Sequence, residues 1–306
     1  MVYELISGSD RWPGLDLRHL AALNAVARTC SFAKAAAQLG YSQPAISQQI
    51  AGLERIVGTR LFERGSGPKP VKLTAAGELL LRHVEVVQAR LAAAQADLEA
   101  LVAGESGTLR IGTFQSVAAR VLPPLVQQFA SEWPDVDIRL TERDDDTDLL
   151  ALVERGELDL AFVMLPLPEG PFDAVEVVSD DYVLISQPDA ALASVADLDG
   201  VPLIGFRQCR SHSLLEDALR ALGIEPNVVF RSDDNGTVQS FVATGMGVAV
   251  MPRLAVDVAD PRVNVVPLPE LEPRRIGLVW HRDRWRPRAL DAFVGLALGV
   301  ESRRVA

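Results

Sequence analysis

A run of apolar residues at alternating steps of four and three constrains this chain more than any other feature of its sequence. The run begins at Leu80 and ends at Leu101, inside a segment that Thr74 can cap and that extends to about residue 103. Steps of four and three place these residues along one narrow stripe of a long helix, which is the heptad pattern of helices that pack side by side. The apolar stripe consists of Leu80, Val84, Val87, Leu91, Ala94, Leu98 and Leu101.

Two partners for the apolar stripe are open on the sequence alone. The stripe can pack within its own chain against the helix expected at residues 16–29, or against the same helix of a second copy. We expect the second arrangement, because the part of the chain before residue 74 is too small to cover the whole stripe. The predicted dimerisation residues are Leu80, Val84, Val87, Leu91, Leu98 and Leu101.

Residues 16–73 have the pattern of three short helices followed by a hairpin. Ser31 can cap a helix that ends at Gly40, and Ser42 can cap the next one. A helix, a four-residue turn that contains glycine and a second helix form the spacing of a helix-turn-helix. The segment LFERGSGPKPVKLT then provides two short extended pieces, which is the form of a wing hairpin.

Charge is divided unevenly along the chain. The formal net charge is −11, which taken alone argues against binding to nucleic acid. Residues 16–73, however, hold eight Lys or Arg against three Asp or Glu, whereas residues 106–306 hold 19 against 31. Such asymmetry indicates that one part of the chain meets a polyanion and the other does not.

Cysteine usage and hydropathy bear on the compartment. The two cysteines lie far apart in sequence, so no disulfide framework is implied, and a reducing environment is the simpler interpretation. No apolar run reaches the roughly 18 residues that a membrane span needs. We therefore expect a cytoplasmic protein without membrane association.

Strands and helices alternate after residue 106, which predicts parallel sheets with crossover helices. The chain is expected to pass between two α/β lobes near residues 163–166 and again near 266–270, with a cleft between the lobes. The expected domains are a tail at 1–15, a winged helix-turn-helix at 16–73, a linker and dimerisation helix at 74–105, and a two-lobed domain at 106–302, of which lobe one is 106–164 with 268–302 and lobe two is 165–267.

The motifs of this chain, taken in order, resemble those of LysR-type transcriptional regulators. They span nearly the whole of residues 16–300, and the first of them is highly specific. The resemblance implies an α/β fold class with an N-terminal winged helix-turn-helix, a dimerising linker helix and a two-lobed effector domain like a periplasmic binding protein. The motifs are SFAKAAAQLGYSQPAISQQIAGLERIVGTRLFER, KLTAAG, GTLRIGTFQSVAARVLPPLVQQF, GELDLAFV and GMGVAVMP.

The resemblance also implies partners. It implies binding to double-stranded promoter DNA, a homodimer that assembles into a homotetramer, and a small-molecule effector. RNA polymerase is a further candidate partner. No cofactor and no metal are expected.

The third predicted helix carries the candidate base contacts. Its N-terminal end offers Gln43, Ser47 and Gln48, and residues at that end of a recognition helix reach base edges in the major groove. Gln can pair with adenine, and Pro44 can meet a thymine methyl group. Many relatives carry Arg where Gln48 stands, which weakens the expected contact to guanine. Further predicted DNA contacts, mainly to phosphates, are Ser31, Lys34, Ser42, Arg60, Arg64, Lys69 and Lys72. The alternative for this set is an ordinary solvated surface, and for Ser31 it is simple helix capping.

The effector is placed between the lobes by the resemblance. Helix N-termini with hydroxyl side chains bind carboxylates, and the guanidinium of Arg207 or Arg210 can add a bidentate contact to such a group. We therefore expect a small, anionic effector, with capping by each serine and a surface ion pair of Arg210 as alternatives. Asp234 and Asn235 open a helix that can face the same cleft. The predicted effector contacts are Thr113, Gln115, Ser116, Arg207, Gln208, Ser211, His212 and Thr237.

Two other classes of protein were weighed against a regulator. An enzyme is disfavoured because the sequence holds no GxSxG, HExxH, P-loop or Rossmann fingerprint. Cys209 and His212 are too few ligands for a zinc site. The acidic run at residues 144–148 lacks the Gly and the distant Glu of a calcium-binding EF-hand loop, so we interpret it as a solvated helix start. A stand-alone solute-binding protein is disfavoured by the basic first domain and by the lack of a signal peptide.

Overall fold

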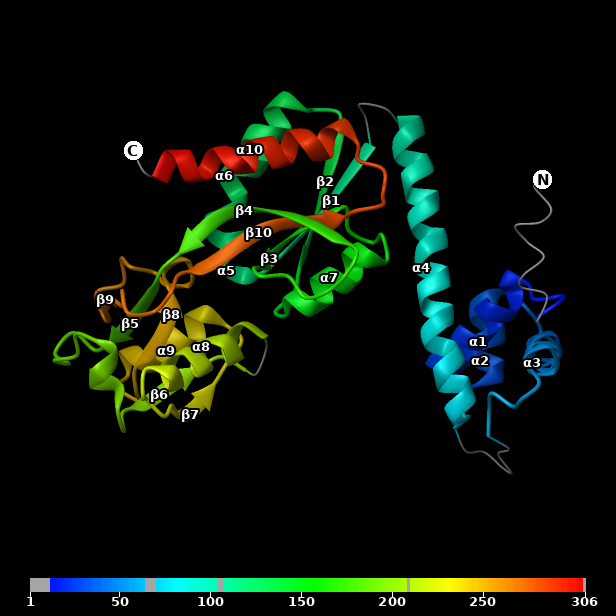
Figure 1. Ribbon diagram of the computed structural model, residues 1–306, viewed down its shortest axis with the longest axis horizontal. Coiled ribbons are helices and arrows are strands. Elements are labelled where there is room, and N and C mark those ends of the chain that lie inside the picture. The colour runs from blue at the N-terminus through cyan, green and yellow to red at the C-terminus, as the bar shows by residue number, and fades with distance from the viewer. Residues whose placement is uncertain (1–11, 64–69, 104–106, 208–209, 305–306) are drawn as a thin grey trace. The chain divides into compact units, whose positions relative to one another are not determined.

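The structure is a computed structural model that describes residues 12–63, 70–103, 107–207 and 210–304. It contains two compact units, residues 1–91 and 92–306, and each unit is described by itself. The long helix α4 (Ala75–Ala103) begins in the first unit and ends in the second (Figure 1). None of the described helices is long and apolar enough to cross a membrane.

Three short helices in the first unit begin at residues that can accept a hydrogen bond from the first turn. The Ser31 hydroxyl accepts from Lys34 N at 3.4 Å, and the Ser42 hydroxyl accepts from Ala45 N at 3.4 Å. Gly40 ends the second helix with a φ of 71°, a left-handed conformation that glycine adopts without strain. The helices are α1 (Leu17–Thr29), α2 (Phe32–Leu39) and α3 (Gln43–Val57).

The core of the first unit includes the beginning of α4. Leu23 and Ile46 are fully buried there, and Leu80 and Val84 of α4 belong to the same core, with exposures of 8% and 1%. The expectation that Leu80 and Val84 pair with a second copy is therefore wrong, because their own chain already covers them. For this part of the apolar stripe, packing within the chain is the correct alternative.

The predicted wing begins and ends in the described part of the chain. Phe62 pairs with Leu73 in an antiparallel bridge, and residues 64–69 lie outside the described residues. Glu54 on α3 fixes the first arm, since its carboxylate accepts a hydrogen bond from Leu61 N at 2.8 Å. A side chain at Gly77 would bring a Cβ to 2.1 Å from the Leu61 carbonyl oxygen, so α4 begins in close contact with this arm.

Lobe one of the second unit contains a five-stranded sheet in the order β2-β1-β3-β10-β4. β1 runs parallel to both β2 and β3, as the alternation of strands and helices predicts, but β10 runs antiparallel to both of its neighbours. The sheet is therefore mixed and not wholly parallel. Its strands are β1 (Gly107–Thr113), β2 (Val136–Glu142), β3 (Leu160–Met164), β4 (Phe172–Asp180) and β10 (Arg274–His281).

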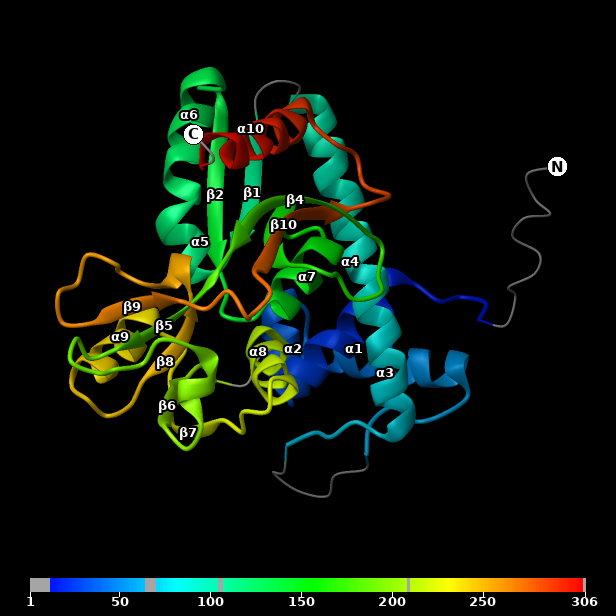
Figure 2. The same cartoon turned by 60° about the vertical axis from the view of Figure 1, so that its left-hand side comes forward.

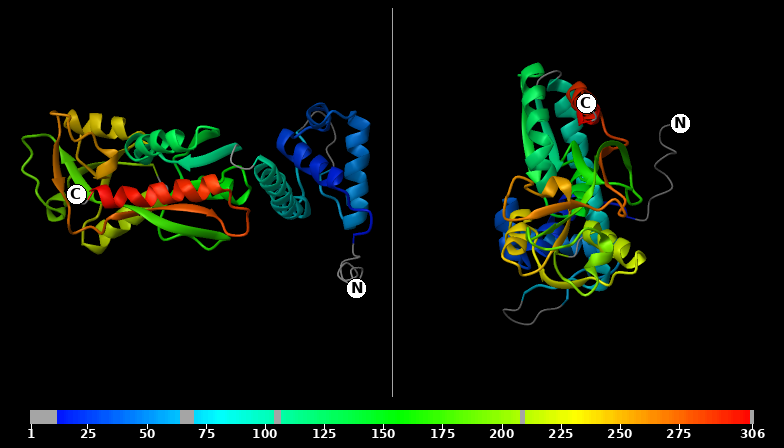
Figure 3. Two further views of the ribbon diagram at one scale, coloured as in Figure 1. Left: turned by 90° about the horizontal axis from the view of Figure 1, so that it is seen from above. Right: turned by 90° about the vertical axis from the view of Figure 1, so that its left-hand side faces the viewer.

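Helices cover both faces of this sheet. α10 runs along one face beside α6 (Figure 3). The buried rings of Phe129 and Phe293 meet between these helices with centroids 5.4 Å apart. α7 covers the other face, where Leu149 and Val163 are fully buried. The helices are α5 (Gln115–Arg120), α6 (Leu122–Glu132), α7 (Asp146–Glu154) and α10 (Arg288–Arg304).

Lobe two contains a three-stranded sheet in the order β8-β5-β9 and a two-stranded sheet of β6 and β7. Strand β5 is buried at every position between its two antiparallel neighbours. The elements are β5 (Tyr182–Ser186), η1 (Val195–Leu198), β6 (Pro202–Gly205), α8 (Arg210–Ala221), β7 (Asn227–Arg231), α9 (Asn235–Ala243), β8 (Ala249–Pro252), η2 (Arg253–Ala255) and β9 (Asn264–Pro267).

The first passage between the lobes lies later in the chain than expected. β4 remains in the sheet of lobe one as far as Asp180, and β5 begins lobe two at Tyr182. Residues 165–180, expected in lobe two, therefore belong to lobe one. β4 lies beside β10 with no crossover helix before it (Figure 2), so the alternation of strands and helices does not mark it.

The end of α4 is fixed to lobe one within the second unit. A side chain at Gly156 would bring a Cβ to 2.8 Å from the Cβ of Ala93, so the two backbones pass in close contact. Arg284, whose side chain is 9% exposed, pairs with Asp97 at 2.9 Å and donates a hydrogen bond to the Leu158 carbonyl at 3.1 Å.

Candidate functional site

The candidate DNA-contacting face of α3 is exposed. Gln43, Pro44 and Gln48 are exposed and Ser47 is half-buried, while Ile46 on the opposite side is fully buried. The Gln43 amide donates to the Ser47 hydroxyl at 3.0 Å, so these two side chains are held together at the beginning of the helix. The polar set that the sequence predicts is thus presented on one accessible face.

Cationic side chains accompany this face in the first unit. Lys34, Arg60 and Lys72 are exposed, and none of them forms an ion pair with another residue in the described part of the chain. Arg64 and Lys69, also predicted to contact phosphates, lie outside the described residues. Three guanidinium or ammonium groups are therefore available to a polyanion.

Ser31 and Ser42 each accept a hydrogen bond from the first turn of their own helix, which is the capping role weighed as the alternative. A serine hydroxyl that accepts one hydrogen bond still carries a proton to donate. Their contact with DNA stays a prediction.

A cleft lies between the two lobes of the second unit. Its empty space is about 790 Å³, including the part that opens to solvent. Both lobes contribute to its walls, mainly through the residues that follow their strands. The lining residues are Phe114, Gln115, Ser116, Asp144, Asp145, Asp146, Met164, Tyr182, Phe206, Leu215, Asp233, Asn235, Pro252, Ala255 and Arg274.

Two of the predicted effector contacts line the cleft, Gln115 and Ser116. Three others are described and do not line it. Thr113 is buried at the end of β1, Arg207 is 74% exposed and pairs with Asp233 at 3.2 Å, and Thr237 is held by Asp234 through its backbone N–H at 2.6 Å.

The side chains of the remaining three predicted effector contacts lie outside what the structure describes. Gln208 lies outside the described residues. Ser211 and His212 lie in the first turn of α8, but their side chains are outside what the structure describes.

Gln115 joins the two lobes. Its side-chain amide donates to the Asp234 carboxylate at 2.9 Å and accepts from Asn235 N at 2.9 Å. The hydrogen bond from Gln115 is the main cause that lowers the pKa of Asp234 below its ordinary value, with Thr237 adding to it. A side chain predicted to contact the effector therefore forms a direct bridge from lobe one to the first turn of α9.

A buried ion pair connects the two segments that pass between the lobes. Arg274 at the beginning of β10 donates to Asp180 at the end of β4 at 2.5 Å and to the Ser116 hydroxyl at 3.0 Å. The two charged side chains are 6% and 2% exposed, and the guanidinium lies 5.2 Å from the centre of the Phe114 ring. This pair cannot be predicted from the sequence, because no spacing pattern relates residues so far apart along the chain.

The acidic run at residues 144–148 is more than a solvated helix start. Asp145 does cap α7, because its carboxylate accepts from Thr147 N at 2.9 Å. Asp146, however, is only 6% exposed, and it accepts a hydrogen bond from Met164 N at 3.3 Å. Asp144, Asp145 and Asp146 all line the cleft, which was not expected from the sequence.

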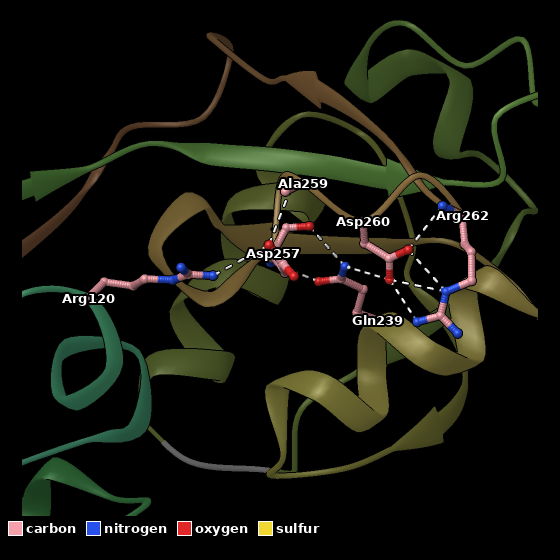
Figure 4. Close-up of polar contacts among 6 residues, drawn as sticks. All are labelled: Arg120, Gln239, Asp257, Ala259, Asp260 and Arg262. Atoms are coloured by element: carbon pink, nitrogen blue, oxygen red, sulfur yellow. Dashed lines mark hydrogen bonds and ion pairs between the residues drawn. The ribbon is translucent and has the colours of Figure 1, made fainter.

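A second contact between the lobes involves Arg120 on α5. Its guanidinium lies 3.7 Å from the Asp257 carboxylate, and the backbone of Asp257 exchanges two hydrogen bonds with the amide of the buried Gln239, at 2.9 and 3.0 Å (Figure 4). Beside them, the side-chain hydrogen bond from Arg262 lowers the pKa of Asp260 to about 2. These residues were not singled out from the sequence.

The helix-turn-helix and the two-lobed cleft domain define a DNA-binding regulator with an effector-binding domain. The model of the bacterial regulatory helix-turn-helix protein, lysR family, matches residues 17–78, and that of the LysR substrate binding domain matches residues 103–301. The chain belongs to the LysR family of transcriptional regulators, as the sequence motifs predicted.

Individual relatives agree with this family. The chain is 32% identical over 287 residues to the HTH-type transcriptional regulator IlvR of Caulobacter vibrioides, which covers 89% of this chain and 94% of the relative. Among solved structures, full-length CbnR complexed with its target DNA is similar in fold, with a TM-score of 0.66, 22% identity and coverage of 95% of this chain and 100% of that chain. Full-length BenM has a TM-score of 0.60 with 20% identity, covering 95% and 98%.

Proposed function

We propose that this regulator binds a small molecule in the cleft between its lobes and that the occupied cleft changes how the protein binds promoter DNA. The observation that carries the proposal is that residues of both lobes line one cleft, while in the described part of the chain two segments, β4 to β5 and β9 to β10, connect the lobes. A ligand that contacts both lobes favours the arrangement in which it makes more contacts.

On the DNA side, we assign base contacts to Gln43, Ser47 and Gln48 on α3 and phosphate contacts to Lys34, Arg60 and Lys72. All of these residues except the half-buried Ser47 are exposed, and the absence of ion pairs among described residues also supports this assignment. Phosphate contacts fix the position of a protein on DNA, whereas base contacts determine the sequence.

The protein acts in this proposal as a dimer formed by the exposed part of the apolar stripe. Val87, Leu91, Leu98 and Leu101 are 42%, 46%, 63% and 55% exposed in the single chain. Two copies would present two α3 helices, and such a dimer reads two half-sites on DNA. Sedimentation velocity of the full chain measures the dimer. The same experiment measures whether dimers pair into the tetramer that the resemblance implies.

The cleft is tested by blocking it. Wild-type protein is titrated onto fluorescent DNA from upstream of its own gene, with and without each compound of a metabolite library. Ala255→Phe places a ring in the cleft, and Ala259→Phe is the matched control, because Ala259 is exposed and does not line the cleft. We expect a compound that changes DNA affinity in wild type and in the control to have no effect on Ala255→Phe. An equal response of both variants would contradict the proposal.

The DNA-contacting face is tested by Gln48→Ala, with the exposed Gln127→Ala on α6 as the control. One good base contact contributes about 1–3 kcal/mol of discrimination. We expect the variant to lose preference for the specific site over unrelated DNA while the control retains it. Unchanged preference in Gln48→Ala would remove this residue from the base-reading set.

A further inference from the structure

The guanidinium of Arg274 has hydrogen-bond donors that no described residue uses. It lines the cleft at the beginning of β10, and its side chain is 6% exposed. Its hydrogen bonds to described residues both come from Nη2, one to Asp180 at 2.5 Å and one to the Ser116 hydroxyl at 3.0 Å. Its Nε is buried and has no acceptor among the described residues. A buried donor of this kind destabilises a protein until an acceptor reaches it.

Ser116 adds a second donor at the same place. Its hydroxyl accepts from Arg274, and a hydroxyl that accepts one hydrogen bond still has its own proton to donate. Ser116 is 3% exposed and lines the same cleft. The hydrogen bond between the two side chains therefore holds an N–H donor and an O–H donor next to each other in one wall of the cleft.

Two adjacent donors select for an oxygen acceptor in the ligand. A carboxylate or carbonyl oxygen has two lone pairs and can accept from both, whereas an ammonium group only donates and would satisfy neither. The ring centre of Phe114 lies 5.2 Å from the guanidinium carbon of Arg274, and Leu215 adds apolar surface to the lining. A few polar groups beside apolar side chains are what fixes the orientation of a small molecule in a pocket.

Asp180 balances the charge of Arg274 without using its Nε. One carboxylate oxygen of Asp180 accepts from Nη2, and the other accepts from Leu254 N of η2 in lobe two at 3.0 Å. Because the ion pair is neutral as a whole, the donors that remain suit an uncharged carbonyl oxygen as well as a carboxylate. A ligand oxygen on Arg274 would therefore contact the ion pair through which lobe one is bonded to lobe two.

We propose that the effector of this regulator is a carboxylate or an amide that is held through its carbonyl-type oxygen. This oxygen accepts from the Ser116 hydroxyl and from the N–H groups of Arg274 that no described residue uses, and the carbon skeleton packs on Phe114 and Leu215. The inference rests on the proposed role of the cleft. It assigns the guanidinium contact to Arg274 in place of Arg207, which is 74% exposed and pairs with Asp233.

The test uses compounds that share a skeleton and differ in the group that meets the guanidinium. The sets are phenylacetate, phenylacetamide and phenethylamine; 3-methylbutanoate, 3-methylbutanamide and 3-methylbutylamine; and glutarate, glutaramide and cadaverine. Thermal unfolding of the full chain is followed at one ionic strength over a range of each compound. We expect acids, amides or both to raise the unfolding temperature with a saturable dose dependence, and the amines not to. Equal stabilisation by amines, or no stabilisation by any acid or amide, would overturn the inference.

The two kinds of oxygen are distinguished by the same measurement. Stabilisation by an acid and not by its amide shows that the site takes an anion. Stabilisation by the amide and not by the acid shows that it takes an uncharged carbonyl. Both results support an oxygen acceptor at Arg274.

A substitution of Arg274 locates the oxygen. Arg274→Lys keeps a positive charge opposite Asp180 and removes the Nε donor and the planar guanidinium. Arg275→Lys is the matched control, because Arg275 is exposed on the same strand, pairs with Glu176 and does not line the cleft. We expect Arg274→Lys to bind the stabilising acid or amide at least about tenfold more weakly, equivalent to 1.4 kcal/mol, and the control to bind it as wild type does. Equal affinities of wild type and Arg274→Lys would contradict the proposed contact.

Ser116→Ala tests the second donor and does not depend on how Arg274→Lys folds. It removes the hydroxyl and leaves the ion pair of Arg274 with Asp180 in place. We expect about two- to tenfold weaker binding of the same compound, at an unfolding temperature of the ligand-free protein that is close to that of wild type. Ser131→Ala, an exposed residue of α6, should bind the compound as wild type does. Unchanged affinity in Ser116→Ala would overturn the two-donor site.

The same samples separate the two proposals. If a compound without an oxygen acceptor changes DNA affinity and Ala255→Phe abolishes its effect, the cleft is the effector site and only the inference about Arg274 is wrong. If no compound acts through the cleft, the proposed function fails with it.

Discussion

The side-chain amide of Gln115 on lobe one lies 2.9 Å from the carboxylate of Asp234 on lobe two, and it donates a hydrogen bond to that carboxylate. The same amide accepts from Asn235 N, so one residue is bonded to both the cap and the first residue of α9. Gln115 also lines the cleft. The spacing of the lobes is thus coupled directly to a residue that a bound ligand can contact.

Removing this bridge should loosen the lobes. Gln115→Ala deletes two hydrogen bonds, and each is worth about 0.5–1.5 kcal/mol of unfolding free energy. We expect a loss of this order in urea unfolding and faster hydrogen exchange at the first turn of α9. Gln127→Ala, an exposed residue of α6, should change neither quantity. Unaltered exchange at α9 in Gln115→Ala would show that the bridge does not hold the lobes.

Acid should protonate the Asp260 carboxylate only at very low pH. Its pKa is lowered from 3.8 to about 2, mainly by the side-chain hydrogen bond from Arg262. Because the pKa is lower in the folded protein, the stabilisation from this carboxylate is complete above the ordinary value and is lost as the pH falls toward about 2. Arg262→Ala should return the pKa of Asp260 toward 3.8, as followed by NMR titration of the carboxyl carbon. A carboxyl that still titrates near 2 in this variant would mean that Arg262 is not the cause.

The apolar stripe should respond differently at its two ends. Leu98→Asp places a charge on an exposed part of the stripe, so we expect it to dissociate the dimer in sedimentation velocity while the chain stays folded. Leu80→Ala lies in the core of the first unit and should cost about 2–5 kcal/mol of unfolding free energy. Oligomers that persist in Leu98→Asp, with normal folding, would exclude this surface as the interface.

Salt dependence should report the phosphate contacts. Lys72→Ala is expected to weaken binding to specific and unrelated DNA alike and to reduce the slope of log affinity against log salt by about 0.9, the value for one phosphate contact on duplex DNA. Arg139→Ala is the control, because Arg139 on β2 pairs with Asp137 in the second unit. A slope equal to that of wild type would remove Lys72 from the phosphate-binding set.

The contact between α4 and lobe one should also be measurable. Asp97→Asn removes the charge that pairs with the nearly buried Arg284, which keeps its hydrogen bond to Leu158 O and a carboxylate oxygen of Asp159 at 3.6 Å. We therefore expect a moderate loss, about 1–3 kcal/mol of unfolding free energy, with faster hydrogen exchange near residue 97. Asp148→Asn, an exposed residue in the first turn of α7, should leave the exchange near residue 97 unchanged.

Local patterns account for what the sequence predicted well. Helices α2 and α3 begin at Ser31 and Ser42 because a hydroxyl at each position accepts a hydrogen bond from the first turn. Such signals lie within a few residues of one another. The apolar stripe was also visible, but periodicity cannot tell whether Leu80 meets its own chain or another copy, since both bury it equally.

Long-range relationships account for what the sequence did not predict. Asp180 and Arg274 meet only because β4 and β10 pair as antiparallel neighbours, and β4 itself was not recognised as a strand. The lining of the cleft depends on long-range contacts in the same way. The folded chain exposes Arg207 and brings carboxylates of both lobes to the lining. The anionic effector expected from helix starts and nearby arginines stays a prediction.

The end of α4 is attached to lobe one at two places, which distinguishes the two lobes. Ala93 and Asp97 lie one turn apart on the same side of the helix, and each contacts lobe one at a separate place. Two points of attachment on one side prevent rotation as well as sliding. Lobe one and the end of α4 are therefore held together at two places. In the proposed function, a ligand that changes the spacing of the lobes moves lobe two relative to both of them, so the surfaces of lobe two would carry the signal.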